Sequence, residues 1–304
     1  MQEYTSWRNF ERLLSFQWRR AIYSLAIAQN QLFVSGHFDG TIKVGSLLTG
    51  QEIYRVKKGH LKWVRSVAID SVMQRIVSGS VDQTIKIWDL MTGELIRSIQ
   101  VFCSVRVVAV DPSGQILVSG YEDGTIVLWD LQEGKLICTL KGHTNAVNSI
   151  VISSNTTIFL SGSEDGNIKV WDLWSEQEIK TIRVPSYSVD SLSISLDMET
   201  AISGGEDGTM ISWNLKTGHC NHVFEGHSDA VTTIIISRHQ ETVISSSLDR
   251  TVKLWDLATG VKIRTLQENS YGVPILATSP NHDIIAIGSS DGAISVWGLG
   301  NLRE

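Results

Sequence analysis

Short apolar runs alternate with clusters of turn-forming residues along the whole chain. Residues 135–140, 147–153, 158–163 and 167–173 are four such runs, rich in Ile, Val and Leu and bounded by Gly, Asp, Asn or Thr. This pattern predicts β-strands. The run 84–90 has apolar residues on both faces of a strand, Ile85 and Ile87 on one and Trp88 and Leu90 on the other, so we expect the predicted sheets to be covered on both faces.

The same arrangement of runs recurs at a regular spacing. An aspartate in the tight turn before the third run of each copy marks the period, in steps of 41 to 43 residues: Asp39, Asp82, Asp123, Asp165, Asp207, Asp249 and Asp291. A tryptophan stands six residues after six of these aspartates, and Gly45 takes that place in the first copy. Four strands in about 40–45 residues, with a Trp-Asp dipeptide, are typical of propeller blades.

Most of the turns contain Asp-Gly, a pair favoured in tight hairpins because glycine tolerates positive φ. Gln83 and Arg250 replace this glycine in two copies, where we expect some cost in backbone conformation.

The sequence resembles the WD-repeat family over essentially its whole length. Trp-Asp stands at 88–89, 129–130, 171–172 and 255–256, and Gly-His at 59–60, 142–143 and 226–227. The departures are Gly45-Ser46, Asn214 and Gly298 in the dipeptide, and four copies without Gly-His. The resemblance implies an all-β fold, a closed seven-bladed β-propeller of four-stranded antiparallel blades.

The two ends of the repeat array complement each other. The last copy stops after its third strand, and an extra strand-like run at about 9–17 precedes the first copy. In WD-repeat propellers an amino-terminal strand completes the last blade, and we expect the same closure here. Residues 1–304 would then form a single propeller domain.

Composition excludes several other classes. The chain is 42% hydrophobic, which supplies a large core, and its net charge of −6 disfavours nucleic acid or an anionic membrane as a partner of the whole molecule. Three cysteines without metal-ligand spacing (Cys103, Cys138 and Cys220) are more typical of a reducing compartment than of a disulfide scaffold. No apolar run reaches membrane-spanning length, and we expect a cytoplasmic protein.

A serine, a histidine and an aspartate recur together and raise the question of catalysis. The three sets, each with a tryptophan, are His60, Ser78, Asp82 and Trp88; His143, Ser161, Asp165 and Trp171; and His227, Ser245, Asp249 and Trp255. A hydrolase needs one open nucleophile and an oxyanion hole, whereas buried polar groups need only one another. Three equal sets favour a structural hydrogen-bond network, which the resemblance also implies, and no catalytic residue is predicted.

The stretch 218–227 contains His219, Cys220, His222 and His227, which invites a metal interpretation. Ligands drawn from one strand and two loops would not converge on a tetrahedral site. The chain also has no glycine-rich phosphate loop and no HExxH sequence. We therefore predict neither a metal nor a cofactor.

In WD-repeat proteins, partners often bind the rim that holds the histidine loops and aspartate turns. The corresponding positions are Tyr23, Phe38, Trp63, Arg65, Val81, Arg106, Glu122, Asn148, Glu164, Asp190, Glu206 and Leu248. Large apolar side chains at turn tips lose hydration free energy unless a partner covers them. We expect an apolar anchor of a protein partner on one side of the ring and a basic portion along the carboxylates on the other.

The function predicted from the sequence is a non-catalytic platform for a protein or peptide partner, monomeric on its own, with membership of a larger complex left open. One alternative is nucleic acid or another polyanion bound by Lys57, Lys58, Lys62, Trp63 and Arg65, although the excess of acids disfavours it. A second alternative is an enzyme activity without a known motif.

Overall fold

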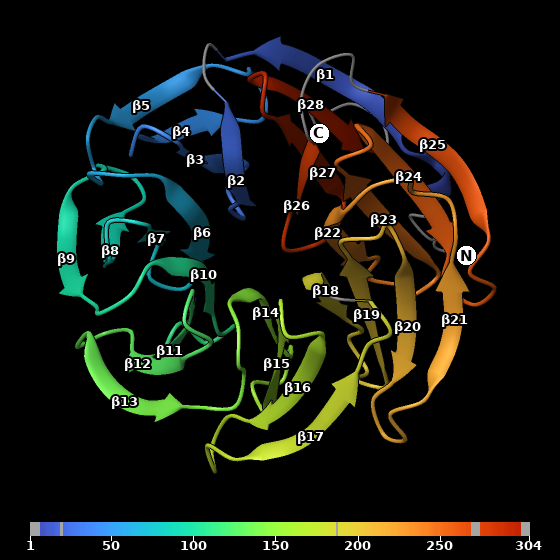
Figure 1. The fold of residues 1–304 in the computed structure, drawn as a ribbon. Helices are drawn as coiled ribbons and strands as arrows, with labels where there is room; N and C mark the ends of the chain where they lie inside the picture. Colours follow the sequence, from blue (N-terminus) through green and yellow to red (C-terminus); the bar gives the residue numbers. More distant parts are fainter. Residues whose placement is uncertain (1–6, 19–20, 187, 269–273, 299–304) are drawn as a thin grey trace.

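The computed structural model describes residues 7–18, 21–186, 188–268 and 274–298; the predicted unit 1–304 extends outside these ranges. Within them, 28 strands form seven separate four-stranded antiparallel sheets. The sheets stand as blades around a central axis (Figure 1). The predicted seven-bladed β-propeller is confirmed.

The first four blades follow one another along the chain. Blade 1 consists of β2 (Ile22–Ile27), β3 (Leu32–His37), β4 (Ile42–Ser46) and β5 (Glu52–Val56). Blade 2 consists of β6 (Val64–Asp70), β7 (Arg75–Ser80), β8 (Thr84–Asp89) and β9 (Leu95–Gln100). Blade 3 consists of β10 (Val105–Val110), β11 (Ile116–Tyr121), β12 (Ile126–Asp130) and β13 (Lys135–Leu140). Blade 4 consists of β14 (Val147–Ile152), β15 (Ile158–Ser163), β16 (Asn167–Asp172) and β17 (Glu178–Arg183).

The remaining blades complete the ring. Blade 5 consists of β18 (Val189–Ile194), β19 (Thr200–Gly205), β20 (Met210–Asn214) and β21 (Cys220–Phe224). Blade 6 consists of β22 (Val231–Ile236), β23 (Thr242–Ser247), β24 (Thr251–Asp256) and β25 (Lys262–Glu268). Blade 7 consists of β26 (Pro274–Thr278), β27 (Ile284–Ser289), β28 (Ala293–Gly298) and β1 (Glu11–Gln17).

Closure joins the two ends of the array as predicted. Strand β1 pairs antiparallel with β28, with Ser15 opposite Ser295, and so forms the outer strand of blade 7. The strand begins at Glu11, two residues later than predicted, because Trp7–Asn9 form a short 3-10 turn. Trp7 and Phe10 are buried against blades 6 and 7, so the segment before the strand also belongs to the core.

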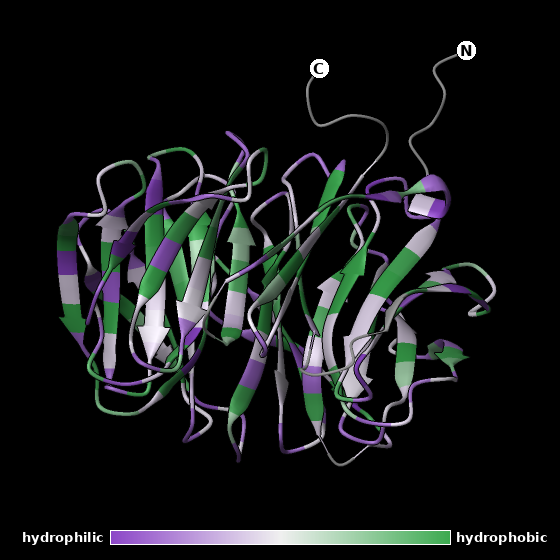
Figure 2. Cartoon of the chain, turned by 90° about the horizontal axis from the view of Figure 1, so that it is seen from above, coloured by the Kyte–Doolittle hydropathy of each residue, from purple (hydrophilic) through white to green (hydrophobic). Residues whose placement is uncertain are grey.

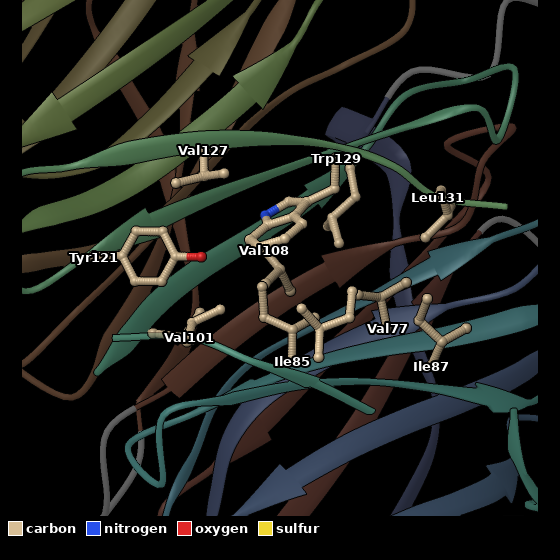
Figure 3. Packing of buried hydrophobic residues seen from close by; sticks show 12 residues of the cluster. Val77, Ile85, Ile87, Val101, Val108, Tyr121, Val127, Trp129 and Leu131 are labelled. Carbon is tan, nitrogen blue, oxygen red and sulfur yellow. The ribbon is translucent and has the colours of Figure 1, made fainter. Parts of the chain in front are cut away.

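The hydrophobic core is divided among the junctions between blades. Figure 3 shows the junction of blades 2 and 3, where Val77, Ile85 and Ile87 face Val108 and Trp129. Each of the seven clusters unites side chains from two neighbouring blades, which explains why the middle strands are apolar on both faces.

A glycine on the second strand of a blade permits this close contact. A Cβ atom at Gly79 would lie 2.5 Å from Cγ1 of Val105 on the next blade, so no larger residue fits there without movement.

The strands run between two faces of the ring, where the turns and loops gather (Figure 2). One face carries the aspartate turns between the second and third strands and the loops that enter the innermost strands; we call this face the rim. Glycine has a positive φ in five of the seven aspartate turns, and Gln83 and Arg250 adopt the same conformation, with φ of 66° and 69°. The expected backbone cost therefore falls on these two residues.

Candidate functional site

In six of the seven inner strands, as far as the structure describes them, a β-bulge places one side chain on the rim. In β6 the register shifts between Val64 and Ser66, so Arg65 has no partner in the ladder. Bulges turn such a residue away from the regular alternation of side chains. The same irregularity recurs in five other inner strands at Tyr23, Arg106, Asn148, Asp190 and Thr232. Five of these six bulge residues belong to the predicted site; Thr232 was missed.

Beneath the rim, blade 4 contains the hydrogen-bonded set predicted from the repeat. His143 Nδ1 lies 2.9 Å from Asp165 Oδ2, and His143 Nε2 lies 2.7 Å from Ser161 Oγ. Trp171 Nε1 donates to the same serine oxygen at 2.8 Å. Blades 2 and 6 repeat this arrangement with His60, Ser78, Asp82 and Trp88, and with His227, Ser245, Asp249 and Trp255.

The geometry of this network is unsuited to nucleophilic catalysis. Ser78, Ser161 and Ser245 are fully buried. Each serine oxygen accepts a hydrogen bond from an indole N–H and lies within hydrogen-bond distance of an imidazole nitrogen. A nucleophile must be open to substrate. The arrangement instead pairs every polar group of the set, which is the condition for burying such groups at low cost.

Electrostatics are consistent with a structural role. Burial by itself would raise the pKa of Asp165, but hydrogen bonds from His143 and from the Thr144 amide outweigh it and lower the pKa to about 2. Burial lowers the pKa of His227, against the influence of Asp249. The aspartates are therefore ionised, and His227 is neutral, at pH 7.

Asp165→Ala is expected to lower the free energy of unfolding by about 1–3 kcal/mol, because it leaves the buried His143 N–H without an acceptor. The loss should be full at pH 7 and should shrink below about pH 4, because the carboxylate's stabilisation is complete above its unfolded pKa of about 3.9 and disappears as the pH falls to its folded pKa of about 2. Denaturant unfolding at several pH values measures this. Asp123→Ala is the matched control, since blade 3 has Val101 at the histidine position; equal losses in both variants would contradict the interpretation.

In two of the odd-numbered blades, another side chain occupies the role of the missing loop histidine as a partner of the buried serine. In blade 1, His37 Nε2 lies 3.0 Å from Ser35 Oγ. In blade 3, Ser119 donates to the hydroxyl of Tyr121 at 2.9 Å, and burial raises the pKa of this tyrosine to about 12. Both replacements stand on the second strand, two residues after the serine, rather than in the loop.

Blade 1 also replaces its missing tryptophan. A Cβ atom at Gly45 would lie 2.6 Å from Cζ2 of Trp18, so the indole of Trp18 occupies the space beside the glycine. The Lys43 ammonium lies 5.0 Å from the Trp18 ring, as the Lys86 ammonium lies 5.7 Å from the ring of Trp88 in blade 2. Trp18 follows directly after the closing strand β1, so closure of the ring also supplies the core of blade 1.

On the rim, three aromatic rings meet across blades 1 and 2. The ring centroid of Trp63 lies 4.9 Å from that of Tyr23 and 5.6 Å from that of Phe38. The Arg65 guanidinium lies over the Trp63 ring at 4.5 Å. Val81 is joined to this group through its backbone N–H, which donates to the Trp63 carbonyl. We call Tyr23, Phe38, Trp63 and Arg65 the aromatic cluster.

Two exposed apolar side chains on the rim loops of blades 2 and 3 were missed by the sequence reasoning. Leu61 is 86% exposed, and Phe102 is fully exposed. Both stand 21 residues before a turn aspartate, Asp82 and Asp123 respectively, so they are equivalent positions of blades 2 and 3. Thr144, Ser186 and Ser228 occupy this position in blades 4 to 6. An alignment of the copies that included this position would have revealed the two apolar residues.

The predicted acidic side of the rim is largely paired within the molecule. Arg106 bridges Glu122 and Glu164 at 3.2 and 3.3 Å. Asn148 donates to Asp190 at 3.0 Å, and burial raises the pKa of Asp190. These residues form a continuous polar belt from blade 3 to blade 5. Arg106 supplies one positive charge to this belt, shared between Glu122 and Glu164.

Two predicted positions stand apart from these groups. Leu248 and Glu206 are exposed on blades 6 and 5, and no contact joins either side chain to the aromatic cluster within the described part of the chain. Lys57, Lys58 and Lys62 are exposed on the segment between β5 and β6, beside the cluster along the chain.

No group of three or more potential metal ligands occurs within the described ranges. Cys220 is exposed on β21, and His219 lies in the turn before it. All three cysteines are unpaired. In the same ranges, no helix is long and apolar enough to cross a membrane.

A ring of seven four-stranded blades, with Trp-Asp repeats and a closing amino-terminal strand, is a WD-repeat β-propeller. The family described as IFT122 first β-propeller matches residues 21–298, and the chain belongs to this family. β-Propellers of this kind are typical of protein–protein interaction scaffolds and are typically non-catalytic. None of the curated proteins matches the sequence.

Proposed function

We propose that this protein is a non-catalytic platform that binds a protein partner on the rim of blades 1 to 3. The observation that carries the proposal is the aromatic cluster, together with exposed apolar side chains on the rim loops of blades 2 and 3. Phe38 is 64% exposed although it packs against Tyr23 and Trp63, and Leu61 and Phe102 project into solvent. Apolar and aromatic side chains gathered at one place, with an arginine beside them, are the composition of interface hot spots.

The propeller supports binding by holding these side chains in place. Trp63 and Tyr23 are partly buried and contact each other edge to face. A partner therefore meets surfaces that are already ordered and loses little further conformational entropy from the platform. The buried serines of the polar network support the absence of catalysis at that site. We also propose a cytoplasmic location, which the three unpaired cysteines favour.

Trp63→Ala is expected to reduce capture of the partner from an extract of the source cells at least tenfold, because it removes the centre of the cluster. Affinity capture followed by mass spectrometry measures this, and thermal melting verifies that each variant is folded. Trp174→Ala is the matched control: Trp174 is 65% exposed on the turn between β16 and β17, at the opposite face from the rim. Capture of the same proteins in equal yield by wild type and both variants would contradict the proposal.

Binding of a polyanion has less support. Of the basic residues near the cluster, Arg65 stacks on Trp63 and Arg106 is engaged with two glutamates, which leaves the lysines of the neighbouring segment. Polyanion binding weakens steeply between low and moderate ionic strength, whereas apolar anchoring changes much less. Capture that collapses with added salt and yields nucleic acid alone would favour this alternative.

A further inference from the structure

Arg65 is a cation without a carboxylate partner. Its guanidinium stacks on Trp63, and it forms no hydrogen bond or ion pair with any residue in the described part of the chain. Burial and the charge of Arg106 lower the pKa of Arg65, against the attraction of Glu122 and Glu164. Those two carboxylates are held by Arg106. A partly buried guanidinium with unused donors favours a ligand that brings an anionic acceptor.

Trp63 has an unused donor in the same place. Its indole Nε1 is buried, and it has no hydrogen-bond acceptor among the described residues. An unpaired buried N–H costs about 1–3 kcal/mol. The indole N–H of Trp63 and the guanidinium of Arg65, which lie together at the centre of the cluster, therefore both lack acceptors. The apolar surface of the Trp63 ring already packs against Tyr23 and Phe38.

The surroundings restrict the shape and charge of a ligand. Phe38, Leu61 and Phe102 offer exposed apolar surface from three neighbouring blades. Lys62 is exposed between Leu61 and Trp63 in the sequence, and adds positive charge to this part of the rim. A free anion would leave the apolar side chains uncovered, and an apolar segment alone would leave Arg65 unpaired.

We infer that the partner segment carries an aspartate or glutamate close in sequence to an aromatic or large aliphatic side chain. The carboxylate pairs with the guanidinium of Arg65, and the apolar side chain packs on the aromatic cluster. This inference rests on the proposed function and identifies the chemistry of the partner. It differs from the basic partner portion predicted from the sequence, because Arg106 and Asn148 already engage three of the four carboxylates that would have attracted such a portion, Glu122, Glu164 and Asp190.

A library of short random peptides displayed on phage, selected against the immobilised protein, tests the inference without knowledge of the partner. We expect the enriched peptides to contain an acidic residue beside an aromatic or large aliphatic one. Their affinities are then measured by fluorescence anisotropy for wild type, Arg65→Gln, Trp63→Ala and the control Trp174→Ala. Arg65→Gln should weaken binding about tenfold to a hundredfold, as expected for loss of a charged hydrogen-bonded pair.

A double-mutant cycle separates a direct contact from general damage to the rim. Replacing the peptide's acid with its amide should weaken binding to wild type by a similar factor, and should have little further effect on Arg65→Gln. Thermal melting verifies that the variants are folded.

The outcomes distinguish the inference from the proposed function. Enriched peptides that require Trp63 but carry lysine or arginine in place of the acid, or that bind Arg65→Gln as tightly as wild type, would overturn the acidic partner and leave the platform intact. Peptides that bind Trp63→Ala as well as wild type, or a selection without enrichment, would contradict both.

Discussion

Asp70→Ala is expected to lower the free energy of unfolding by about 3–5 kcal/mol, because it leaves a buried guanidinium without its counter-charge. Asp70 and Arg75 are both buried at the face opposite the rim, and Asp70 Oδ2 accepts from Arg75 Nε at 2.9 Å and Nη2 at 2.7 Å. Arg75 also donates to the carbonyls of Gly114 and Leu131, so the pair joins blade 2 to blade 3. Chemical denaturation at pH 7 measures the loss.

Two further variants separate the buried charge from other effects. Glu133→Ala breaks the exposed ion pair with Lys135 and should leave the stability almost unchanged. The double replacement Asp70→Leu/Arg75→Leu should be less destabilising than Asp70→Ala, since it removes both charges together. If Asp70→Ala cost no more than Glu133→Ala, the pair would have no special role in joining the blades.

Removal of residues 1–18 is expected to abolish cooperative thermal unfolding. The truncation takes away β1 and three buried aromatic side chains, Trp7, Phe10 and Trp18, each of which contributes about 1.5–3 kcal/mol by burial. The sum is comparable to the whole stability of a typical domain, about 5–15 kcal/mol. The loss also exposes the edge of β28, so we expect aggregation on heating. Circular dichroism and light scattering during a thermal ramp measure both effects.

A synthetic peptide of residues 7–18 should restore cooperative melting to the truncated protein, because it supplies the missing strand and core side chains. The same peptide with Phe16→Asp is the matched control, since Phe16 contacts both Trp18 and Phe33 through its ring. A truncated protein that melts cooperatively at the wild-type temperature would show that β1 is dispensable for closure.

The fold could be predicted from the sequence because the same structural pattern occurs seven times along the chain. Each copy contains the same apolar runs, the same turn and the same tryptophan, so the departures in single copies, such as Gly45, did not hide the period. Closure was predictable for a related reason. The last copy lacks a strand, and one strand-like run precedes the first copy.

The side chains that replace missing histidines and a missing tryptophan could not be predicted. They depend on contacts between segments that do not occupy equivalent positions in the repeat. Trp18 precedes the first copy, yet it fills the space beside Gly45. Tyr121 is an ordinary strand residue in the sequence, and only the fold places its hydroxyl beside Ser119. The pairing of Arg106 with Glu122 and Glu164 spans blades 3 and 4 in the same way.

The bulges of the inner strands have a consequence for how such a protein diversifies. A bulge residue such as Arg65 or Asn148 is excluded from the ladder, so its side chain can change without the loss of a cross-strand pair. In the described part of the chain, six such positions surround the central axis. The propeller itself is held together by the hydrophobic clusters between blades and by the buried polar networks. Replacing a bulge residue therefore leaves the ladder intact, and its effect on stability depends on the side-chain bonds that the residue makes, such as those of Arg106 and Asn148 in the polar belt.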